Sequence, residues 1–348
     1  MIICLLFIIL SLLVVRVLLD YTEGLENKKE TIEDLKWPFL NIKDENYKKV
    51  DIVCIRGPLE QQKDHDLFDK FKKENKLIVG CSSYLSFPIK AENKLVSYKN
   101  FFHKGKRIDE LVDGWVHPFR ENKNIKNKNI KNKNIKNKNT LLLSESDFSD
   151  NIEKLKNFNP STKKIKYDFI CYCPSDETCD SGWNYHNKNW PLAKKTIEVA
   201  CNKLNLKGVL IGREKCEINV KDENLERHEK IEYYSFIEKI SQSKFMIIQN
   251  YEDASPRVVT ESLLVDTPVL MNKDILGGWK YLNSQTGVFY DENDIEEKIK
   301  IILKTKYSPR KYFVKHHGVD ISGKKFRDFI VKIDPSYSKH RILRFSVS

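Results

Sequence analysis

The sequence predicts an α/β fold in two halves, each built on a parallel sheet covered by helices. Strand-like apolar runs alternate with amphipathic helical segments, the pattern of parallel strands joined by right-handed crossovers. The length of 348 residues suits two domains, and 40% apolar residues suffice for two buried cores. A polar stretch at 147–165 separates the two runs of elements. Two such halves in tandem are expected to face each other across a ligand-binding cleft.

Each half contains apolar runs typical of buried strands and amphipathic segments typical of helices. In the first half, the expected strands are 50–57, 76–83, 114–119 and 140–146, and the expected helix is 65–75. In the second half, the expected strands are 166–173, 207–212, 244–250 and 267–272. The expected helices of the second half are 190–206, 234–243, 256–265 and 292–304.

The net charge of +12 is concentrated in one low-complexity segment. Residues 122–139 read NKNIK three times and then NKN, with seven lysines and no acidic residue, which leaves +5 for the other 330 residues. Such a repeat buries too little apolar surface to offset the cost of ordering, so it predicts a solvated loop inserted in the first half. A polybasic site for anionic lipid or RNA is the alternative. Because no aromatic residue interleaves the lysines to stack on bases, we do not expect a nucleic-acid partner.

The N-terminal segment is the candidate membrane contact. Residues 1–20 are apolar except for Ser11, Arg16 and Asp20, close to the roughly 20 residues that span a bilayer. A cleaved signal peptide is the alternative, but the segment lacks a basic start and a small-residue cleavage site. We therefore expect a single-pass anchor at 1–20 and a stem at 21–45. Charges beyond the anchor are balanced, so they leave the orientation of the anchor open. The sequence has no Asn-x-Ser/Thr glycosylation acceptor, and this favours a cytosolic catalytic part.

The eight cysteines show no paired framework, and several lie within apolar runs, which indicates reduced thiols. Cys171, Cys173 and Cys179 are close enough to suggest zinc ligands. His186 is the only nearby fourth ligand, so we expect no metal site.

Residues 247–282 carry the most informative motif. A buried strand runs into an acidic loop with Asp253, and Ser255 and Pro256 then mark the expected cap and first turn of a helix. The first N–H groups of that helix, at Arg257 and Val258, are expected to bind a phosphate together with the Arg257 side chain. Glu261 lies in the same helix, at a distance that suits a carboxylate accepting two ribose hydroxyls.

This motif resembles the donor-binding signature of GT-B glycosyltransferases, above all the retaining family with an acidic residue, seven intervening residues and a Glu (family 4, glycosyl transferases group 1). Here the motif is Asp253-ASPRVVT-Glu261, followed by the strand TPVL and by Gly277-Gly278. It departs from the family in having Asp first, unless Glu252 takes that role. The resemblance covers 166–305, and it implies two Rossmann-like domains, with catalytic roles for Asp253 and Glu261.

Further site residues are expected around this motif. For the donor diphosphate, Lys188 is the best candidate cation and Arg213 the second, and the two glycines are expected to let the backbone approach the sugar. On the acceptor side, residues at strand ends of the first half are candidates, with His117 also a possible catalytic group. These acceptor-side candidates are His117, Arg120, Ser144 and Asp147.

The function predicted is transfer of a sugar from a nucleotide-sugar donor to a hydroxyl of a glycan, lipid or protein. By resemblance the reaction retains the anomeric configuration and needs neither a metal nor a cofactor. The alternative is a catalytically inactive glycosyltransferase-like or basic membrane-associated binding protein. The expected domains are an acceptor domain at 46–160, a nucleotide-sugar-binding domain at 161–335 and a basic tail at 336–348.

Overall fold

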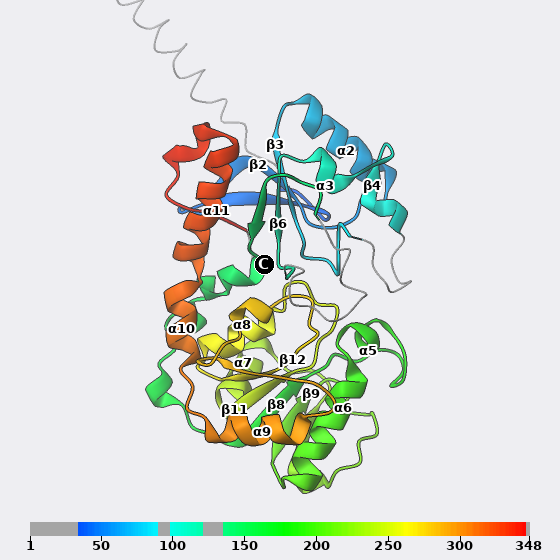
Figure 1. Ribbon diagram of the computed structural model, residues 1–348, viewed down its shortest axis with the longest axis vertical. Coiled ribbons are helices and arrows are strands. Elements are labelled where there is room, and N and C mark those ends of the chain that lie inside the picture. Colours follow the sequence, from blue (N-terminus) through cyan, green and yellow to red (C-terminus); the bar gives the residue numbers. More distant parts are fainter. Residues whose placement is uncertain (1–33, 90–97, 121–134, 346–348) are drawn as a thin grey trace, which may run out of the picture. The chain divides into compact units, whose positions relative to one another are not determined.

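The computed structural model describes residues 34–89, 98–120 and 135–345, which contain two six-stranded sheets (Figure 1). The first sheet has the order β14-β1-β2-β3-β6-β7. Its strands are β1 (Phe39–Asp44), β2 (Lys49–Ile55), β3 (Leu77–Cys81), β6 (Gly114–His117), β7 (Thr140–Leu142) and β14 (Leu343–Phe345). Strands β2, β3, β6 and β7 are parallel, as the sequence predicts, whereas β1 runs antiparallel to both β2 and β14.

The second sheet is parallel throughout, in the order β10-β9-β8-β11-β12-β13. Its strands are β8 (Tyr167–Tyr172), β9 (Gly208–Ile211), β10 (Leu225–His228), β11 (Ser243–Ile248), β12 (Val269–Asn272) and β13 (Gly287–Tyr290). The four strands expected here are confirmed, and β10 and β13 extend the sheet at its two edges. Buried runs such as VLMN in β12 suit strands that helices cover on both faces.

Helices cover both faces of the second sheet. One face packs on α6 (Trp190–Glu198) and α9 (Ile295–Lys304), and the other packs on α7 (Tyr233–Ser241), α8 (Arg257–Leu264) and α10 (Pro309–His316). The short helices α4 (Glu153–Lys156) and α5 (Trp183–Asn187) precede α6 along the chain. The helix expected at 190–206 is shorter than predicted, because α6 passes into a π-helical turn at Val199–Lys203.

The first sheet has separate cores on its two faces. One core contains Phe68 and Phe71 of α2 (Gln62–Lys73), which is the crossover helix expected at 65–75. The short α3 (Ile108–Leu111) follows a small hairpin of β4 (Phe102–His103) and β5 (Lys106–Arg107). The other core contains Phe326 and Phe329 of α11 (Val319–Ile333).

The C-terminal part of the chain differs from its expected place. We expected residues 161–335 to form one domain and 336–348 to form a tail. Instead, α11 packs on the first sheet and β14 pairs with β1, so the chain crosses back to the first half after α10. The apolar face of α11 and the apolar residues of β14 are buried against the first sheet (Figure 1).

Two further expectations concern segments that the structure describes only in part. The expected anchor at 1–20 lies outside the described residues, and within the described ranges no helix is both long and apolar enough to cross a bilayer. Of the repeat at 122–139, only 135–139 is described; it is a loop with exposed lysines, and its asparagines hold it against the first half. The Asn137 side-chain amide donates to the carbonyl oxygens of Asp109 and Val112, and the Asn139 amide donates to that of Asp113.

Candidate functional site

A cavity of about 1110 Å³ is lined by residues from both halves of the chain. The second half contributes the start of α8, the acidic loop before it, Lys188 and residues 229–233. The first half contributes Arg56, and the segment after β7 contributes Glu145 and Ser146. The carboxyl ends of β8 and β9 open onto the same space, through Tyr172 and Ile211. This is the edge at which parallel α/β sheets bind their ligands.

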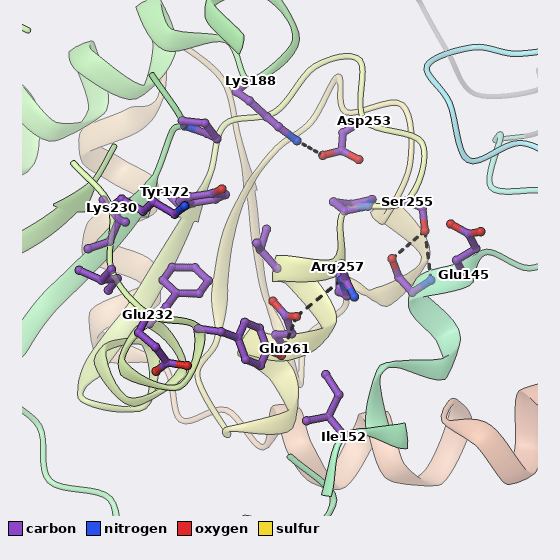
Figure 2. Close-up of a pocket in the computed structure, with 18 of the residues that line it drawn as sticks. Glu145, Ile152, Tyr172, Lys188, Lys230, Glu232, Asp253, Ser255, Arg257 and Glu261 are labelled. Carbon is purple, nitrogen blue, oxygen red and sulfur yellow. Dashed lines mark hydrogen bonds and ion pairs between the residues drawn. The ribbon is translucent and has the colours of Figure 1, made fainter. Parts of the chain in front are cut away.

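Helix α8 begins at Arg257, and Pro256 occupies the cap position. The expected cap, Ser255, does not bond to the helix. Its hydroxyl lies 2.7 Å from the hydroxyl of Ser146 and accepts a hydrogen bond from the Ser146 N–H at 3.1 Å (Figure 2). The prediction of the capping residue was therefore wrong, because Ser255 joins α8 to the segment after β7. Arg257 and Val258 line the cavity as expected, with the positive end of the helix dipole beside them.

Lys188 and Asp253 form an ion pair in the cavity wall, with Nζ 2.5 Å from Oδ2 (Figure 2). The side-chain amide of Asn250 donates to the same carboxylate oxygen at 2.8 Å. Burial would lower the pKa of Lys188, but the adjacent carboxylate outweighs burial and holds the pKa above its usual value. Lys188 is therefore a fixed cation. The pair brings together the expected diphosphate cation and Asp253, to which the sequence resemblance gave a catalytic role.

Glu261 is the most buried carboxylate of the cavity wall, with only 2% of its surface exposed. The hydroxyl of Tyr233 donates to its Oε1 at 3.0 Å, and the Arg257 Nε lies 3.8 Å from the same oxygen. Burial raises the pKa of Glu261 above its usual value, although Tyr233 and Arg257 both favour the charged form. Oε2 remains to accept a hydrogen bond from a ligand hydroxyl, as the sequence analysis expected for a ribose.

Gly277 and Gly278 are close to the site but do not line the cavity. A Cβ on Gly277 would lie 2.0 Å from the carbonyl oxygen of Ala254, and one on Gly278 would lie 2.6 Å from Cγ of Pro256. The Gly277 N–H also donates to the carbonyl oxygen of Asp253 at 2.8 Å. The two glycines therefore support the acidic loop from behind, instead of admitting a sugar to the backbone as we expected.

Arg213 does not line the cavity. It is buried, pairs with Asp176 at 2.5 Å and donates to the carbonyl oxygen of Cys179 at 3.1 Å. Cys179 forms a disulfide with Cys216, so the expectation that all cysteines are reduced was wrong for this pair. Its two cysteines are 37 residues apart and lie in polar loops, which gave no sequence signal. Arg213 thus holds these loops together and is not placed to bind a diphosphate.

The expected acceptor residues of the first half also lie outside the cavity lining. The His117 ring stacks on Phe119, and the Arg120 guanidinium lies over the rings of Trp279 and Phe289. Arg120 therefore joins the two halves of the chain by cation–π contacts. His117 is half-buried and is not part of the cavity lining.

Ser144 and Asp147 belong to a buried network outside the cavity lining. The Ser144 hydroxyl lies 3.0 Å from that of Tyr281, and Asp147 pairs with Lys280 and with His317. Burial opposes the charge of Asp147, but Lys280 and His317 hold its pKa far below its usual value. Since Lys280 comes from the second half and His317 follows α10, this network joins the two halves.

The residues that sequence analysis missed come from dispersed segments. Arg56 and Glu145 line the cavity and form an ion pair at 3.0 Å, 89 residues apart in sequence. Arg56 follows β2 and Glu145 follows β7, so a position just beyond a parallel strand was the available signal. Tyr233, at the start of α7, had no signal of its own.

One cluster of the described residues has the composition of a metal site. Ligand atoms of Asp44, Glu45 and His340 lie within 4.8 Å of one another. None of the three lines the cavity, and Asp44 already accepts hydrogen bonds from the N–H groups of Asn46 and Lys48. The cluster therefore has no part in the chemistry of the cavity.

Comparison with known proteins identifies the fold. No protein-family model matches the chain, and no curated protein matches it in sequence. Among solved structures, TarM superposes with a TM-score of 0.52 at 13% identity, over 78% of this chain and 53% of TarM. The lipopolysaccharide outer core galactosyltransferase WaaB gives 0.53 at 13% identity, over 81% and 75%. A glycosyltransferase from Rickettsia africae gives 0.52 at 14% identity, over 82% and 77%.

These structures are GT-B glycosyltransferases, and at such low identity their similarity shows a shared fold alone. The chain spans about half the length of TarM. The mixed α/β architecture with two six-stranded sheets is therefore the two-domain GT-B architecture, as the sequence resemblance implied.

Proposed function

We propose that this protein transfers a sugar from a nucleotide-sugar donor to a hydroxyl of an acceptor. The observation that carries the proposal is the wall of the cavity around α8. There a fixed cation, the positive end of a helix and a buried carboxylate are gathered on the fold of known glycosyltransferases. A nucleotide-sugar is a ligand whose parts match these three groups in kind.

The donor would bind with each part against a different group. Its diphosphate would lie at the start of α8, near Lys188 and Arg257, because oriented N–H groups and cations bind phosphate. Its ribose hydroxyls would donate to Glu261, whose carboxylate Tyr233 orients. The transferred sugar would lie near Asp253, which Lys188 holds in place.

The proposed reaction breaks the bond between the anomeric carbon and the diphosphate oxygen, and the diphosphate leaves with the electron pair. The acceptor oxygen forms the new bond to the anomeric carbon, and its proton passes to the departing diphosphate. Retention of the anomeric configuration follows the resemblance around Asp253 and Glu261. Lys188, Arg257 and the helix terminus would stabilise the charge of the leaving diphosphate, so we propose that no metal ion is needed.

Membrane association through residues 1–20 is part of the proposal, since their composition suits a single-pass anchor. Liposome flotation tests this anchor, with the full chain compared to a form that lacks residues 1–20. The anchor is rejected if both forms float. The side of the membrane is a separate question. The expected cytosolic placement is opposed by the Cys179–Cys216 disulfide, because disulfides persist in oxidising compartments. Protease protection of sealed vesicles decides between the two sides.

Turnover by the full chain in detergent tests the proposed activity. The protein is incubated with UDP-, GDP- and ADP-sugars and a mixture of acceptor glycans, and released diphosphate and glycosylated product are measured. We expect one donor to be consumed, with NMR of the product showing the anomeric configuration of the donor and with chelator leaving the rate unchanged. Binding of a nucleotide without any transfer would instead identify a catalytically inactive relative. Absence of all nucleotide binding would reject the donor site.

A further inference from the structure

Three aromatic rings are in contact with one another near Arg56, which lines the cavity. Trp37 precedes β1, Tyr84 follows β3, and Trp183 begins α5 in the second half. The Trp37 and Tyr84 ring centroids are 5.6 Å apart in an edge-on arrangement, and those of Tyr84 and Trp183 are 5.9 Å apart and stacked. Trp37 is 45% exposed and Trp183 is 37% exposed, which is unusual for the largest apolar side chain.

The position of Trp37 is set by its neighbours. A Cβ on Gly57 would lie 2.3 Å from the indole ring, so the ring occupies the space that a side chain at this position would fill. On the same indole, the Arg56 guanidinium lies 5.4 Å from the ring centroid. The ring is therefore held by packing and by a cation–π contact, although much of its surface faces solvent.

Arg56 connects the aromatic surface to the cavity. It lines the cavity, contacts Trp37 and pairs with Glu145, which also lines the cavity. Because Glu145 uses Oε1 for Arg56, its Oε2 remains to accept a hydrogen bond from a ligand. The Trp37 ring, first of the three rings, thus lies directly beside a polar pair that carries no net charge.

This combination decides among possible ligands. A lipid chain would remove the Arg56–Glu145 pair from water without offering a hydrogen bond to Glu145 Oε2. A charged peptide would find a pair already neutralised. A neutral pyranose ring matches both parts, because its C–H face suits the negative face of an aromatic ring and its hydroxyls suit Arg56 and Glu145.

We propose that Trp37, Tyr84 and Trp183 form an aromatic platform that binds a neutral oligosaccharide acceptor, with Arg56 and Glu145 holding the hydroxyls nearest the cavity. The proposal rests on the proposed function in that it names the acceptor class of the same transfer. Trp183 comes from the second half and the other two rings from the first. The acceptor would therefore contact both halves of the chain.

Binding of neutral oligosaccharides tests the platform separately from the donor site. An array of neutral glucose-, mannose-, galactose- and N-acetylglucosamine-based oligosaccharides is screened with the full chain, and hits are titrated by tryptophan fluorescence. We expect Trp37→Ala and Trp183→Ala each to weaken binding about ten-fold. Trp183→Phe should keep most of the affinity because it retains a ring, whereas Trp183→Leu should lose it although it remains apolar. The exposed Tyr234, which does not line the cavity, provides the control Tyr234→Ala, which should bind like the parent.

Calorimetry with nucleoside diphosphates on the same variants separates the two proposals and shows that each variant is folded. If diphosphate binds and no oligosaccharide does, the platform is rejected and the donor site stands. If oligosaccharides bind and no nucleotide does, the proposed function fails and the platform stands. Equal binding by Trp183→Leu and the parent, or binding of phosphatidylcholine vesicles in place of sugars, would also overturn the platform.

Discussion

The two walls of the cavity differ in how their polar groups are held. In the wall from the second half, Glu261 is almost fully buried and hydrogen-bonded to Tyr233, and the Lys188–Asp253 pair is also largely buried. In the facing wall, the Arg56–Glu145 pair is exposed to nearly the same degree as Lys188–Asp253, and the wall differs in adjoining aromatic rings that face solvent. Charges fixed in a buried wall suit one ligand of fixed chemistry, such as a diphosphate with its ribose. An exposed wall with flat rings suits ligands that vary in length.

The largest expected effect is the loss of Lys188 from the buried wall. Lys188→Met removes the cation beside the proposed diphosphate, so diphosphate affinity should fall by about 2 kcal/mol, roughly 30-fold. It also leaves Asp253 without its partner. The free energy of unfolding should therefore fall by about 2 kcal/mol, less than for a fully buried pair because the side chains are 24% and 16% exposed.

Calorimetry and denaturant unfolding measure these two losses. The exposed pair Lys195–Glu292 provides a control, and Lys195→Met should change neither quantity measurably. The double variant Lys188→Met/Asp253→Asn should recover stability without recovering diphosphate affinity. Parent-like diphosphate affinity in Lys188→Met would show that the phosphates lie elsewhere.

A second prediction concerns the support of the buried wall from behind. Gly277→Ala should lower the free energy of unfolding by about 1–3 kcal/mol, because its Cβ would overlap the Ala254 carbonyl oxygen and displace the acidic loop. Gly105→Ala is the matched control, since nothing lies within 4 Å of its Cβ. Only the backbone strain of a φ of +79° applies there, so the free energy of unfolding should fall by about 1 kcal/mol. Denaturant unfolding compares the two variants. Equal losses would show that the loop accommodates the extra methyl group.

Substitutions in the exposed wall should have smaller effects on stability and on diphosphate affinity. Arg56→Gln removes the charge paired with Glu145, but the Gln amide can still donate to that carboxylate, whereas Met at position 188 cannot donate to Asp253. The free energy of unfolding should therefore fall by only about 1 kcal/mol or less. Diphosphate affinity should fall less than in Lys188→Met. Urea unfolding and calorimetry of both variants provide the comparison. A larger loss of stability in Arg56→Gln than in Lys188→Met would reverse the proposed difference between the walls.

The smallest expected effect is a pH dependence of the network that joins the two halves. Burial lowers the pKa of His317 despite its contact with Asp147, so the unfolded chain binds its proton more readily. The stability that His317 contributes is therefore present above the unfolded pKa of roughly 6.5 and is lost as the pH falls below it. Thermal unfolding between pH 8 and 5 should show a decline that His317→Gln reduces. The same substitution at the exposed His186 should leave the decline intact, and an unchanged slope in His317→Gln would refute the assignment.

The buried wall was largely predictable because its residues are close in sequence. Asp253, Arg257 and Glu261 lie within one loop and one helix, so strand and helix patterns placed them together. The pairing of Lys188 with Asp253 was not predicted, because it depends on how two loops meet across 65 residues. The two glycines were found by pattern, but their contact with the back of the loop is a packing detail that spacing does not encode.

The exposed wall and the C-terminal crossing were harder to predict for a different reason. Arg56 and Glu145 are single charged residues after short strands, and only the order of strands in the sheet brings them together. Strands β1 and β14 pair although they are about 300 residues apart in sequence, and three residues of β14 give no clear period. His117 and Arg120 were chosen from the same strand-end reasoning, which cannot tell the cavity from a junction between the halves.

The central claim is that a nucleotide-sugar binds at the start of α8, and calorimetry of two variants tests it most directly. Parent, Glu261→Gln and Asp253→Asn are each titrated with the preferred nucleoside diphosphate and with its sugar conjugate, with the exposed Glu297→Gln as control. Glu261→Gln should weaken both ligands by about 1.5–3 kcal/mol, because the ribose is common to both. Asp253→Asn should weaken the sugar conjugate more than the diphosphate. If both variants bind both ligands like the parent, the donor does not bind at this helix and the proposed function is contradicted.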